Sequence, residues 1–211
     1  MAAVLERGPH EDILVYKGSP DIGLIEATIA TGSIRRIAQW KNRYPHHTIT
    51  GLRGNVQTRL KKLEENDWNG AVFAKAGLYR VEILPENHIV LDWMIPAPAQ
   101  GVIGITCREE ETPTVDILQQ LNHEPTEITS GIERSFLRTL EGGCSAPIGA
   151  LARINKGSVH FSGGLFAPDG SQKILVEKQV NISQAKDLGI SAAREILQQG
   201  GSEIMENLAN V

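Results

Sequence analysis

Short β-prone runs alternate three times with segments of helical spacing between residues 27 and 80. The strand runs and the helical segments that follow them are 27–31 and 33–41, 48–52 and 56–63, and 71–74 with a short stretch around Leu78 and Tyr79. Ser33 and Asn55 stand where the N-caps of the first two helices are expected. This alternation predicts an α/β domain with a parallel sheet and right-handed crossovers.

The periodicity changes after residue 80, where Pro85, Pro96 and Pro98 break it and a domain boundary is expected. The elements predicted beyond that point are a β-prone run at 102–106, helices at 115–121 and 130–140, strands at 158–166 and 173–180 joined by a hairpin over Pro168-Asp169-Gly170-Ser171, and a helix at 184–198 with Ser183 as its N-cap and Gly200-Gly201 as its stop. Such a pattern is typical of a small α+β domain.

Composition excludes several classes of function. With a net charge of -4, the chain has no overall attraction for nucleic acid or anionic membranes. No apolar run approaches the roughly 20 residues that span a bilayer, and residues 1–7 lack the features of a signal peptide, so we expect a cytoplasmic protein without a membrane partner. The histidines lack metal-ligand spacing, and Cys107 and Cys144 are too few for a disulfide framework, so we expect free thiols and no metal.

Five arginines follow the three predicted strands. Arg35 and Arg36 come after the first strand, Arg53 and Arg59 after the second, and Arg80 after the third. Because the carboxyl ends of parallel strands meet at one edge of a sheet, we expect these side chains near a common crevice. Guanidinium groups bind carboxylates and phosphates in bidentate fashion, so the pattern predicts a ligand with several acidic groups. The alternative, solvated helix arginines, suits any single position better than all five together.

Cys144 lies in the stretch Glu141-Gly142-Gly143-Cys144, directly after a predicted helix. The two glycines permit unusual backbone angles and the close approach of another group, which favours an accessible thiol. From the residues alone, a small apolar filler is the more common role of a free cysteine. A reactive thiol would need a nearby base or cation, and no such pair can be identified in the sequence.

Six stretches of the chain form one recognisable series. They are Thr31-Gly32-Ser33-Ile34-Arg35-Arg36 with Gln39, Leu52-Arg53-Gly54-Asn55-Val56-Gln57-Thr58-Arg59-Leu60, Ala74-Lys75-Ala76-Gly77-Leu78-Tyr79-Arg80, Pro96-Ala97-Pro98-Ala99-Gln100-Gly101, Glu133-Arg134-Ser135-Phe136 and Glu141-Gly142-Gly143-Cys144. In order and spacing, the series resembles the porphobilinogen deaminase family, also called the hydroxymethylbilane synthases, from about Val4 to the end of the chain.

The resemblance implies an enzyme of tetrapyrrole biosynthesis. Members of the family deaminate and polymerise four porphobilinogen units to hydroxymethylbilane on a dipyrromethane cofactor, which a thioether joins to the cysteine of the Gly-Gly-Cys loop, here Cys144. The implied partners are porphobilinogen and the growing pyrrole chain, and the complete form is expected to be a monomer. Each pyrrole carries an acetate and a propionate, and the residues implied to bind them are Arg35, Arg36, Arg53, Arg59, Arg80, Thr31, Ser33 and Gln100.

Two departures from the family pattern bear on activity. The family's first domain begins with strand and helix units that carry a Lys-Asp pair, whose aspartate assists deamination and coupling, and no matching stretch occurs in this sequence. The resemblance therefore assigns no catalytic residue to the chain and implies that these 211 residues are inactive alone. The second departure is Ala99, where the family usually has glycine.

The same series of motifs implies a division of the chain into four segments. These are a remnant of the first domain with a hinge (1–20), an α/β domain with the arginines (21–95), a segment that returns to the incomplete first domain (96–118) and an α+β domain with the cysteine loop (119–211). The expected fold is a parallel-sheet α/β domain resembling half of a periplasmic binding protein, followed by a small α+β C-terminal domain. An incomplete first domain should leave 11–17 and 102–106 as strands without neighbours.

Two other interpretations stay open at this point. The arginine-bearing sheet could be an anion- or pyrrole-binding module without catalysis, or the chain could be a structural or regulatory fragment. Binding of pyrroles without release of ammonia would favour the module, and scattered positions of Arg35, Arg53 and Cys144 would favour the fragment.

Overall fold

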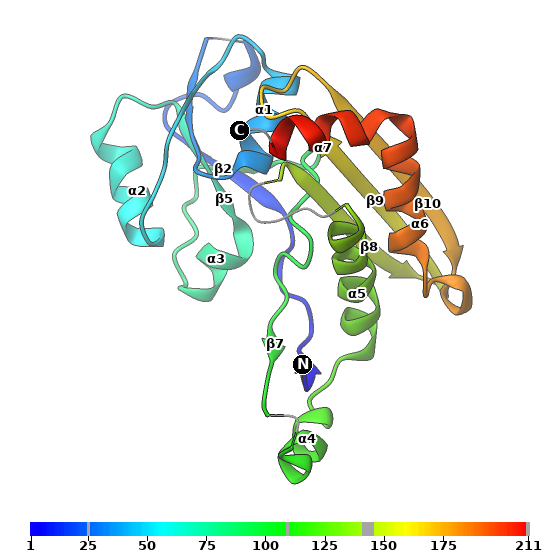
Figure 1. Ribbon diagram of the computed structural model, residues 1–211. Coiled ribbons are helices and arrows are strands. Elements are labelled where there is room, and N and C mark those ends of the chain that lie inside the picture. Colours follow the sequence, from blue (N-terminus) through cyan, green and yellow to red (C-terminus); the bar gives the residue numbers. More distant parts are fainter. Residues whose placement is uncertain (25, 109, 141–145, 210–211) are drawn as a thin grey trace.

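The computed structural model describes residues 1–24, 26–108, 110–140 and 146–209 (Figure 1). A larger α/β part and a smaller α+β part lie side by side, and a short two-stranded ribbon with a helix extends from them near the N-terminus (Figure 1). The fold class expected from the sequence is confirmed. Cys144 lies outside the described residues, so its role as the attachment point stays a prediction.

The α/β part is built on a five-stranded mixed sheet. In spatial order its strands are β4 (Thr48–Thr50), β3 (Thr28–Ala30), β5 (Gly70–Ala74), β2 (Asp12–Tyr16) and β6 (His88–Val90). β3 runs parallel to both β4 and β5, as the alternating pattern predicts, whereas β2 is antiparallel to β5 and to β6. The three predicted strands therefore form the parallel side of the sheet.

β2 occupies an interior position in this sheet. Its side chains alternate between the two faces, since Ile13 and Val15 join one apolar core and Leu14 joins the other. A strand that is apolar on both faces is stable where the sheet continues around it. The expectation that residues 11–17 form a strand without neighbours is wrong, because β5 and β6 pair with the two edges of β2.

Helices cover both faces of the five-stranded sheet. α1 (Ile34–Arg43) lies on one face after the 3₁₀ turn η1 (Ile22–Leu24) and β3, and α2 (Val56–Glu65) and α3 (Lys75–Arg80) lie on the other. Asn55 caps α2 as predicted, because its side-chain oxygen accepts a hydrogen bond from the Thr58 amide at 2.8 Å. Ser33 stands at the N-cap of α1 with extended backbone angles but makes no side-chain capping bond.

A two-stranded ribbon joins the start of the chain to the segment after residue 101. β1 (Ala3–Val4) pairs antiparallel with β7 (Gly104–Ile105), and α4 (Thr112–Gln119) follows. The expectation that 102–106 has no neighbouring strand is wrong on one side, where β1 lies. On the other side of β7, the described residues contribute no strand. The pairing could not be read locally, because the two strands lie about a hundred residues apart in the sequence.

The α+β part contains a three-stranded antiparallel sheet in the order β10 (Lys173–Asn181), β9 (Ser158–Phe166) and β8 (Ile148–Asn155). The β9–β10 hairpin forms where the sequence predicts it, whereas β8 was not predicted. α5 (Glu124–Thr139) and α6 (Leu188–Ile196) pack side by side on one face of this sheet (Figure 1). Phe136 of α5 and Phe161 of β9 meet in the core between the helices and the sheet, at a ring-centroid distance of 5.2 Å.

The last helical segment differs from its prediction at both ends. A 3₁₀ turn, η2 (Ile182–Gln184), precedes α6, and Asp187 rather than Ser183 stands at the N-cap of α6. Gly200 interrupts the helix with a φ of 100°, but the chain continues through η3 (Leu197–Gly201) into α7 (Ser202–Ala209). None of the helices in the described ranges combines the length and apolarity that a membrane crossing requires.

Specific contacts join the α+β part to the α/β part. The Ala150 amide donates to the Pro96 carbonyl at 3.0 Å, and a Cβ on Gly149 would lie only 2.8 Å from the carbonyl oxygen of Ile95. At the hairpin, the Asn42 side-chain amide donates to the Gly170 carbonyl at 2.9 Å. These contacts fix β8 and the hairpin against the segments that adjoin the arginine-bearing sheet.

Candidate functional site

The three strand-to-helix junctions that bring in the predicted arginines lie at one edge of the five-stranded sheet. β3, β4 and β5 are parallel, so their carboxyl ends share that edge. Neighbouring junctions are also close to one another, because a Cβ on Gly32 would lie 2.5 Å from the Leu52 carbonyl oxygen and one on Gly77 in α3 would lie 4.0 Å from Val56 Cγ2 at the start of α2. The structure therefore brings together the three strand-to-helix junctions named by the sequence; we call this the arginine edge.

Thr31 and Ser33 belong to the first of these junctions. Thr31 is buried, and its amide donates to the Thr50 carbonyl at 2.9 Å, which joins the ends of β3 and β4. The Thr31 hydroxyl accepts a long hydrogen bond of 3.4 Å from the Ser33 amide. Ser33 is half-buried, and its hydroxyl makes no capping bond, so this oxygen is available to a ligand.

Arg35 and Arg36 are not open surface groups, because both bind the buried carboxylate of Asp12 at the start of β2. Arg35 Nη1 donates to Asp12 Oδ2 at 2.7 Å, and Arg36 donates to Asp12 Oδ1 from Nε at 3.0 Å and from Nη2 at 2.8 Å. Arg35 also donates to the Ile95 carbonyl, and Arg36 to the Val72 carbonyl. The two guanidinium groups therefore form a fixed, largely buried cluster.

The charges in this cluster do not cancel. Burial raises the pKa of Asp12, but the charges and hydrogen bonds of Arg35 and Arg36 outweigh it, so the pKa lies below the usual 3.8. Burial lowers the pKa of Arg36, and the positive charges of Arg35 and Arg59 also lower it. The negative charge of Asp12 acts in the opposite direction, but the pKa stays below its usual value. One carboxylate thus faces two guanidinium groups with a third nearby, and an anionic ligand would relieve the excess.

Arg53, Arg59 and Arg80 carry the remaining positive charge of the arginine edge. Arg53 and Arg80 are exposed, and Arg59 is half-buried with its Nε donating to the Gly54 carbonyl at 2.7 Å. None of the three forms an ion pair with a carboxylate of the described residues. Their guanidinium forks therefore keep most of their donors for a ligand.

Gln100 links the Asp12 cluster to the loop before β7. Its side-chain nitrogen donates to the His10 carbonyl at 2.8 Å and to Asp12 Oδ1 at 3.1 Å, and its oxygen accepts from Arg35 Nη2 at 3.3 Å. The structure thus places Gln100 beside Arg35 and Asp12, and its role as a contact of the ligand stays a prediction.

A second buried ion pair lies on the other side of the same loop. Arg7 donates to both oxygens of Glu133 in α5, at 2.6 Å and 3.2 Å, and its Nε donates to the Gln100 carbonyl at 2.9 Å. The amides of Ala99 and Ala152 donate to the same carboxylate at 2.6 Å and 2.8 Å. Burial raises the pKa of the Glu133 carboxyl, and the hydrogen bonds and charge of Arg7 oppose that rise. This carboxylate therefore ties the start of the chain, the Gln100 loop, α5 and β8 together.

Ala99, the departure from the family pattern, has a φ of 60°. This is the left-handed region that glycine tolerates and that costs an L-residue roughly 1–2 kcal/mol. We expect Ala99→Gly to raise the free energy of unfolding by about 0.5–1 kcal/mol, because relief of this strain exceeds the added chain entropy. Chemical denaturation measures the change. Ala97→Gly, at a position with an ordinary φ, is the control and should lose stability; a similar loss at residue 99 would contradict the strain.

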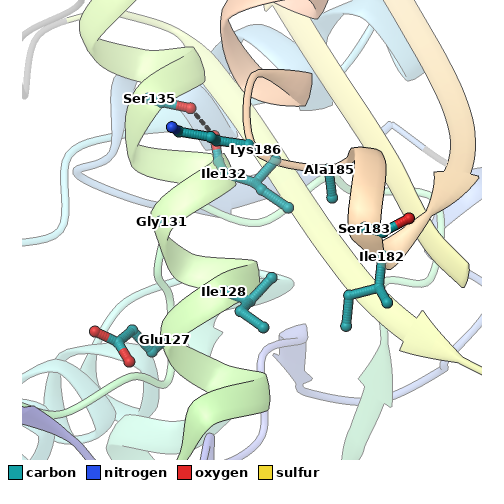
Figure 2. Close-up of a pocket in the computed structure, with 9 residues that line it drawn as sticks. All are labelled: Glu127, Ile128, Gly131, Ile132, Ser135, Ile182, Ser183, Ala185 and Lys186. Atoms are coloured by element: carbon teal, nitrogen blue, oxygen red, sulfur yellow. Dashed lines mark hydrogen bonds between the residues drawn. The ribbon is translucent and has the colours of Figure 1, made fainter. Parts of the chain in front are cut away.

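Two hollows of the molecule lack the charge of the arginine edge. A groove of about 440 Å³ lies between α5 and the segment 182–186, and Glu127 and Lys186 are the charged residues that line it (Figure 2). A cleft of about 690 Å³ is lined by residues 90–96 and by side chains of the β8–β10 sheet, and its lining contains three acids. Neither hollow includes a residue predicted from the sequence to bind a polycarboxylate.

Sequence reasoning missed three charged residues that hold the site in place: Asp12, Arg7 and Glu133. A usable signal existed for Asp12, since it directly precedes the apolar run Ile13-Leu14-Val15. A carboxylate at the start of a buried strand must be paired with a cation. Glu133 stands in one of the motif stretches, but its pairing with Arg7 has no local signal, because the two residues are 126 apart in the sequence.

Comparison with known proteins shows the family of the chain. Residues 1–116 match the family model described as "Porphobilinogen deaminase, dipyromethane cofactor binding domain", and residues 128–198 match "Porphobilinogen deaminase, C-terminal domain". The chain belongs to the porphobilinogen deaminase family. Membership places it among the transferases of tetrapyrrole biosynthesis, and the cofactor of the domain matched by its first 116 residues is dipyrromethane.

Curated members of the porphobilinogen deaminase family align with almost the whole chain. The enzyme of Prochlorococcus marinus (strain NATL1A) is 36% identical over 215 residues, which cover 99% of this chain and 68% of the relative. That of Syntrophomonas wolfei is 34% identical over 209 residues, covering 97% and 68%, and that of Thermus thermophilus is 35% identical over 213 residues, covering 99% and 71%. The chain thus spans about two thirds of the length of these relatives.

The residues at the arginine edge fit a dipyrromethane. Its acetate and propionate side chains need several cationic partners, and Arg53, Arg59 and Arg80 have no carboxylate partner in the described ranges. The Asp12 cluster adds a further uncompensated charge close to Arg59. The donor set is therefore suited to a small polycarboxylate rather than to a neutral ligand.

Proposed function

We propose that this chain is the cofactor-bearing part of an enzyme that deaminates porphobilinogen and polymerises four units to hydroxymethylbilane, with dipyrromethane joined by a thioether to Cys144. The observation that carries the proposal is the positively charged arginine edge, where two guanidinium groups bind one buried carboxylate and three more, from the adjacent junctions, have no carboxylate partner among the described residues. Family membership supplies the identity of the polycarboxylate.

The residues of the arginine edge take different parts in this proposal. Bound dipyrromethane provides the pyrrole to which new units are joined. Arg53, Arg59 and Arg80 bind the carboxylates of the cofactor and of the growing chain, and Ser33 is a lesser contact. Arg35 binds through the donors that it does not give to Asp12 and Ile95. Arg36, Thr31 and Gln100 are held by buried contacts and border the same ligand.

These 211 residues orient the reacting groups but contain no match to the family's catalytic aspartate. Deamination requires a group that transfers a proton to the leaving amine, and arginine cannot do so near neutral pH because it keeps its proton. We infer that turnover requires a carboxylate from outside these residues. The complete enzyme, with the segments 1–20, 21–95, 96–118 and 119–211 as its domain parts, then acts as a cytoplasmic monomer.

Release of ammonia from porphobilinogen tests the proposal. In a complete chain with the upstream catalytic segment present, Arg53→Ala should slow release about tenfold or more, because a charge-assisted hydrogen bond contributes about 1.5–3 kcal/mol. Arg194→Ala, an exposed arginine in α6, is the matched control and should have no effect. Undiminished turnover in Arg53→Ala would remove this residue from the site. Binding of pyrroles by the complete chain without any release of ammonia would favour the alternative, a binding module.

A further inference from the structure

The larger of the two hollows, the cleft of about 690 Å³, is lined by residues of both parts of the molecule. One wall is the face of the β8–β10 sheet that α5 and α6 do not cover. Ser162 of β9 pairs with Leu151 of β8 and with Glu177 of β10, and all three line the cleft. Alternate residues of these strands, such as Phe161 and Val176, belong to the core under the helices. The cleft has the size of a small-molecule site.

Apolar surface in this cleft is open to an occupant. Val90 is 43% exposed and Leu175 of β10 is 46% exposed, and both belong to the lining. Trp93 is half-buried and lines the same cleft, and Arg43 of α1 lies over its ring at 4.9 Å from the ring centroid. This cation–π contact fixes the indole in place. Apolar walls with a few convergent polar groups are typical of sites for small organic ligands.

The three acids of the lining, Glu11, Asp92 and Glu177, come from three different segments of the chain. No ion pair within the described part of the chain involves any of them. Glu11 Oε2 is buried, and it accepts no hydrogen bond from the residues that the structure describes. A buried carboxylate oxygen without a donor is costly. The lining therefore offers a specific position for a hydrogen-bond donor or a cation of an occupant.

The cations of the cleft do not balance its acids. Among the described lining residues, Arg153 of β8 is the sole arginine or lysine, and its Nη2 lies 3.4 Å from His10 Nε2. Burial lowers the pKa of His10 against the attraction of Glu11, and the charges of Arg153, Arg7 and Lys75 lower it further, so His10 adds little positive charge near neutral pH. Three acids thus face one permanent cation. The cleft therefore favours a positively charged ligand, in contrast to the arginine edge.

We propose that this cleft binds a small amphipathic amine, that is, an apolar ring that carries one protonated primary amino group. The ammonium group donates a hydrogen bond to Glu11 Oε2 and is attracted by the carboxylate of Glu177, and the ring packs against Trp93 and Leu175. Because these residues belong to both parts of the molecule, the ligand bridges the α/β part and the α+β part. The inference goes beyond the proposed function and depends on neither the cysteine loop nor the arginine edge.

Isothermal titration calorimetry of the 211-residue chain with 2-phenylethylamine near neutral pH tests the proposal. We expect saturable one-to-one binding with a dissociation constant of about 1 mM or below. Two further compounds separate the contributions of the charge and the ring. 3-Phenylpropionate carries a carboxylate in place of the ammonium group, and propylamine lacks the ring. Each should bind about tenfold more weakly or worse, because each loses one of the two kinds of contact.

Two variants test the contacts on the two sides of the cleft. Glu11→Gln should weaken the binding of 2-phenylethylamine about tenfold or more, because it removes the charge from the carboxylate that accepts the ammonium hydrogen bond. Leu175→Lys should weaken binding by a similar factor, because it replaces apolar surface by a like charge. Glu64→Gln, at an exposed acid of α2 outside the lining, is the control and should bind like the unchanged chain. Circular dichroism checks that each variant is folded.

Three outcomes would overturn the proposal. They are the absence of saturable binding of 2-phenylethylamine, equal affinity for 3-phenylpropionate, and unchanged affinity in a folded Glu11→Gln or Leu175→Lys variant. The measurement involves no turnover. Ammonia release by the complete chain is a separate experiment, so either proposal can fail without the other.

Discussion

Replacement of Asp12 by asparagine is expected to lower the free energy of unfolding by about 3–5 kcal/mol. The substitution keeps the size of the side chain but removes the negative charge that faces two buried guanidinium groups. Removal of one partner from a buried ion pair is costly because the remaining charges stay desolvated without compensation. Denaturation of the 211-residue chain by urea near neutral pH measures the loss.

The matched control for Asp12→Asn is Glu65→Gln. Glu65 pairs with Lys61 across one helical turn at 3.5 Å, and both side chains are more than half exposed. Exposed pairs of this kind contribute about 0.5 kcal/mol or less, so the control should be almost neutral. A loss in Asp12→Asn no larger than that of the control would show that the cluster does not stabilise the fold.

The lowered pKa of Asp12 predicts that the stabilising effect of this carboxylate depends on pH. The pKa of Asp12 is lower in the folded chain than its unfolded value of 3.8, so its stabilising contribution is fully present above pH 3.8 and is lost as the pH falls through the folded pKa. The difference in unfolding free energy between the unchanged chain and Asp12→Asn should therefore be constant near neutral pH. It should narrow below pH 3.8, and a constant difference down to the lowest accessible pH would contradict the lowered pKa.

Glu133→Gln is expected to lower the free energy of unfolding by about 3 kcal/mol. The Glu133 carboxylate accepts four hydrogen bonds, two from Arg7 and one each from the Ala99 and Ala152 amides. A glutamine amide can accept on one side only, so its NH₂ group would face donors that are then left unsatisfied. Each unsatisfied buried donor costs about 1–3 kcal/mol. The same denaturation measurement applies.

Glu127→Gln is the control for this second substitution, because Glu127 lies on the same helix and is exposed. Its side chain accepts one hydrogen bond from Asn122, so the change should stay within about 0.5 kcal/mol. Equal losses of unfolding free energy in the two variants would contradict the conclusion that Glu133 holds the Gln100 loop, α5 and β8 together.

Local elements could be predicted from the sequence because their signals are local. The β9 strand agrees with its prediction at both ends, and the Asn55 cap and the β9–β10 hairpin have signals within a few residues. The position of β2 could not be predicted, because strand pairing depends on residues far away in the sequence. β8 was missed because Gly149, Ala150 and Ala152 weaken its β-strand signal, and the close approach of Ile95 explains the glycine at position 149.

The candidate site also has one part that could be predicted from the sequence and one part that could not. The arginines could be placed at one edge because the carboxyl ends of parallel strands coincide there. The pairing of Arg35 and Arg36 with Asp12 could not be foreseen, since it depends on the antiparallel addition of β2 to the sheet. Because these two side chains are buried, we propose Arg53, Arg59 and Arg80 as the main contacts of the ligand.

The mass of the intact complete chain, made together with its upstream segment, tests the central claim most directly. We expect a mass above that of the polypeptide by one dipyrromethane, and the bare polypeptide mass for Cys144→Ser, because the thioether requires the thiol. A bare mass for the unchanged complete chain, or an equal adduct on Cys144→Ser, would contradict the assignment of Cys144 as the residue that carries the cofactor.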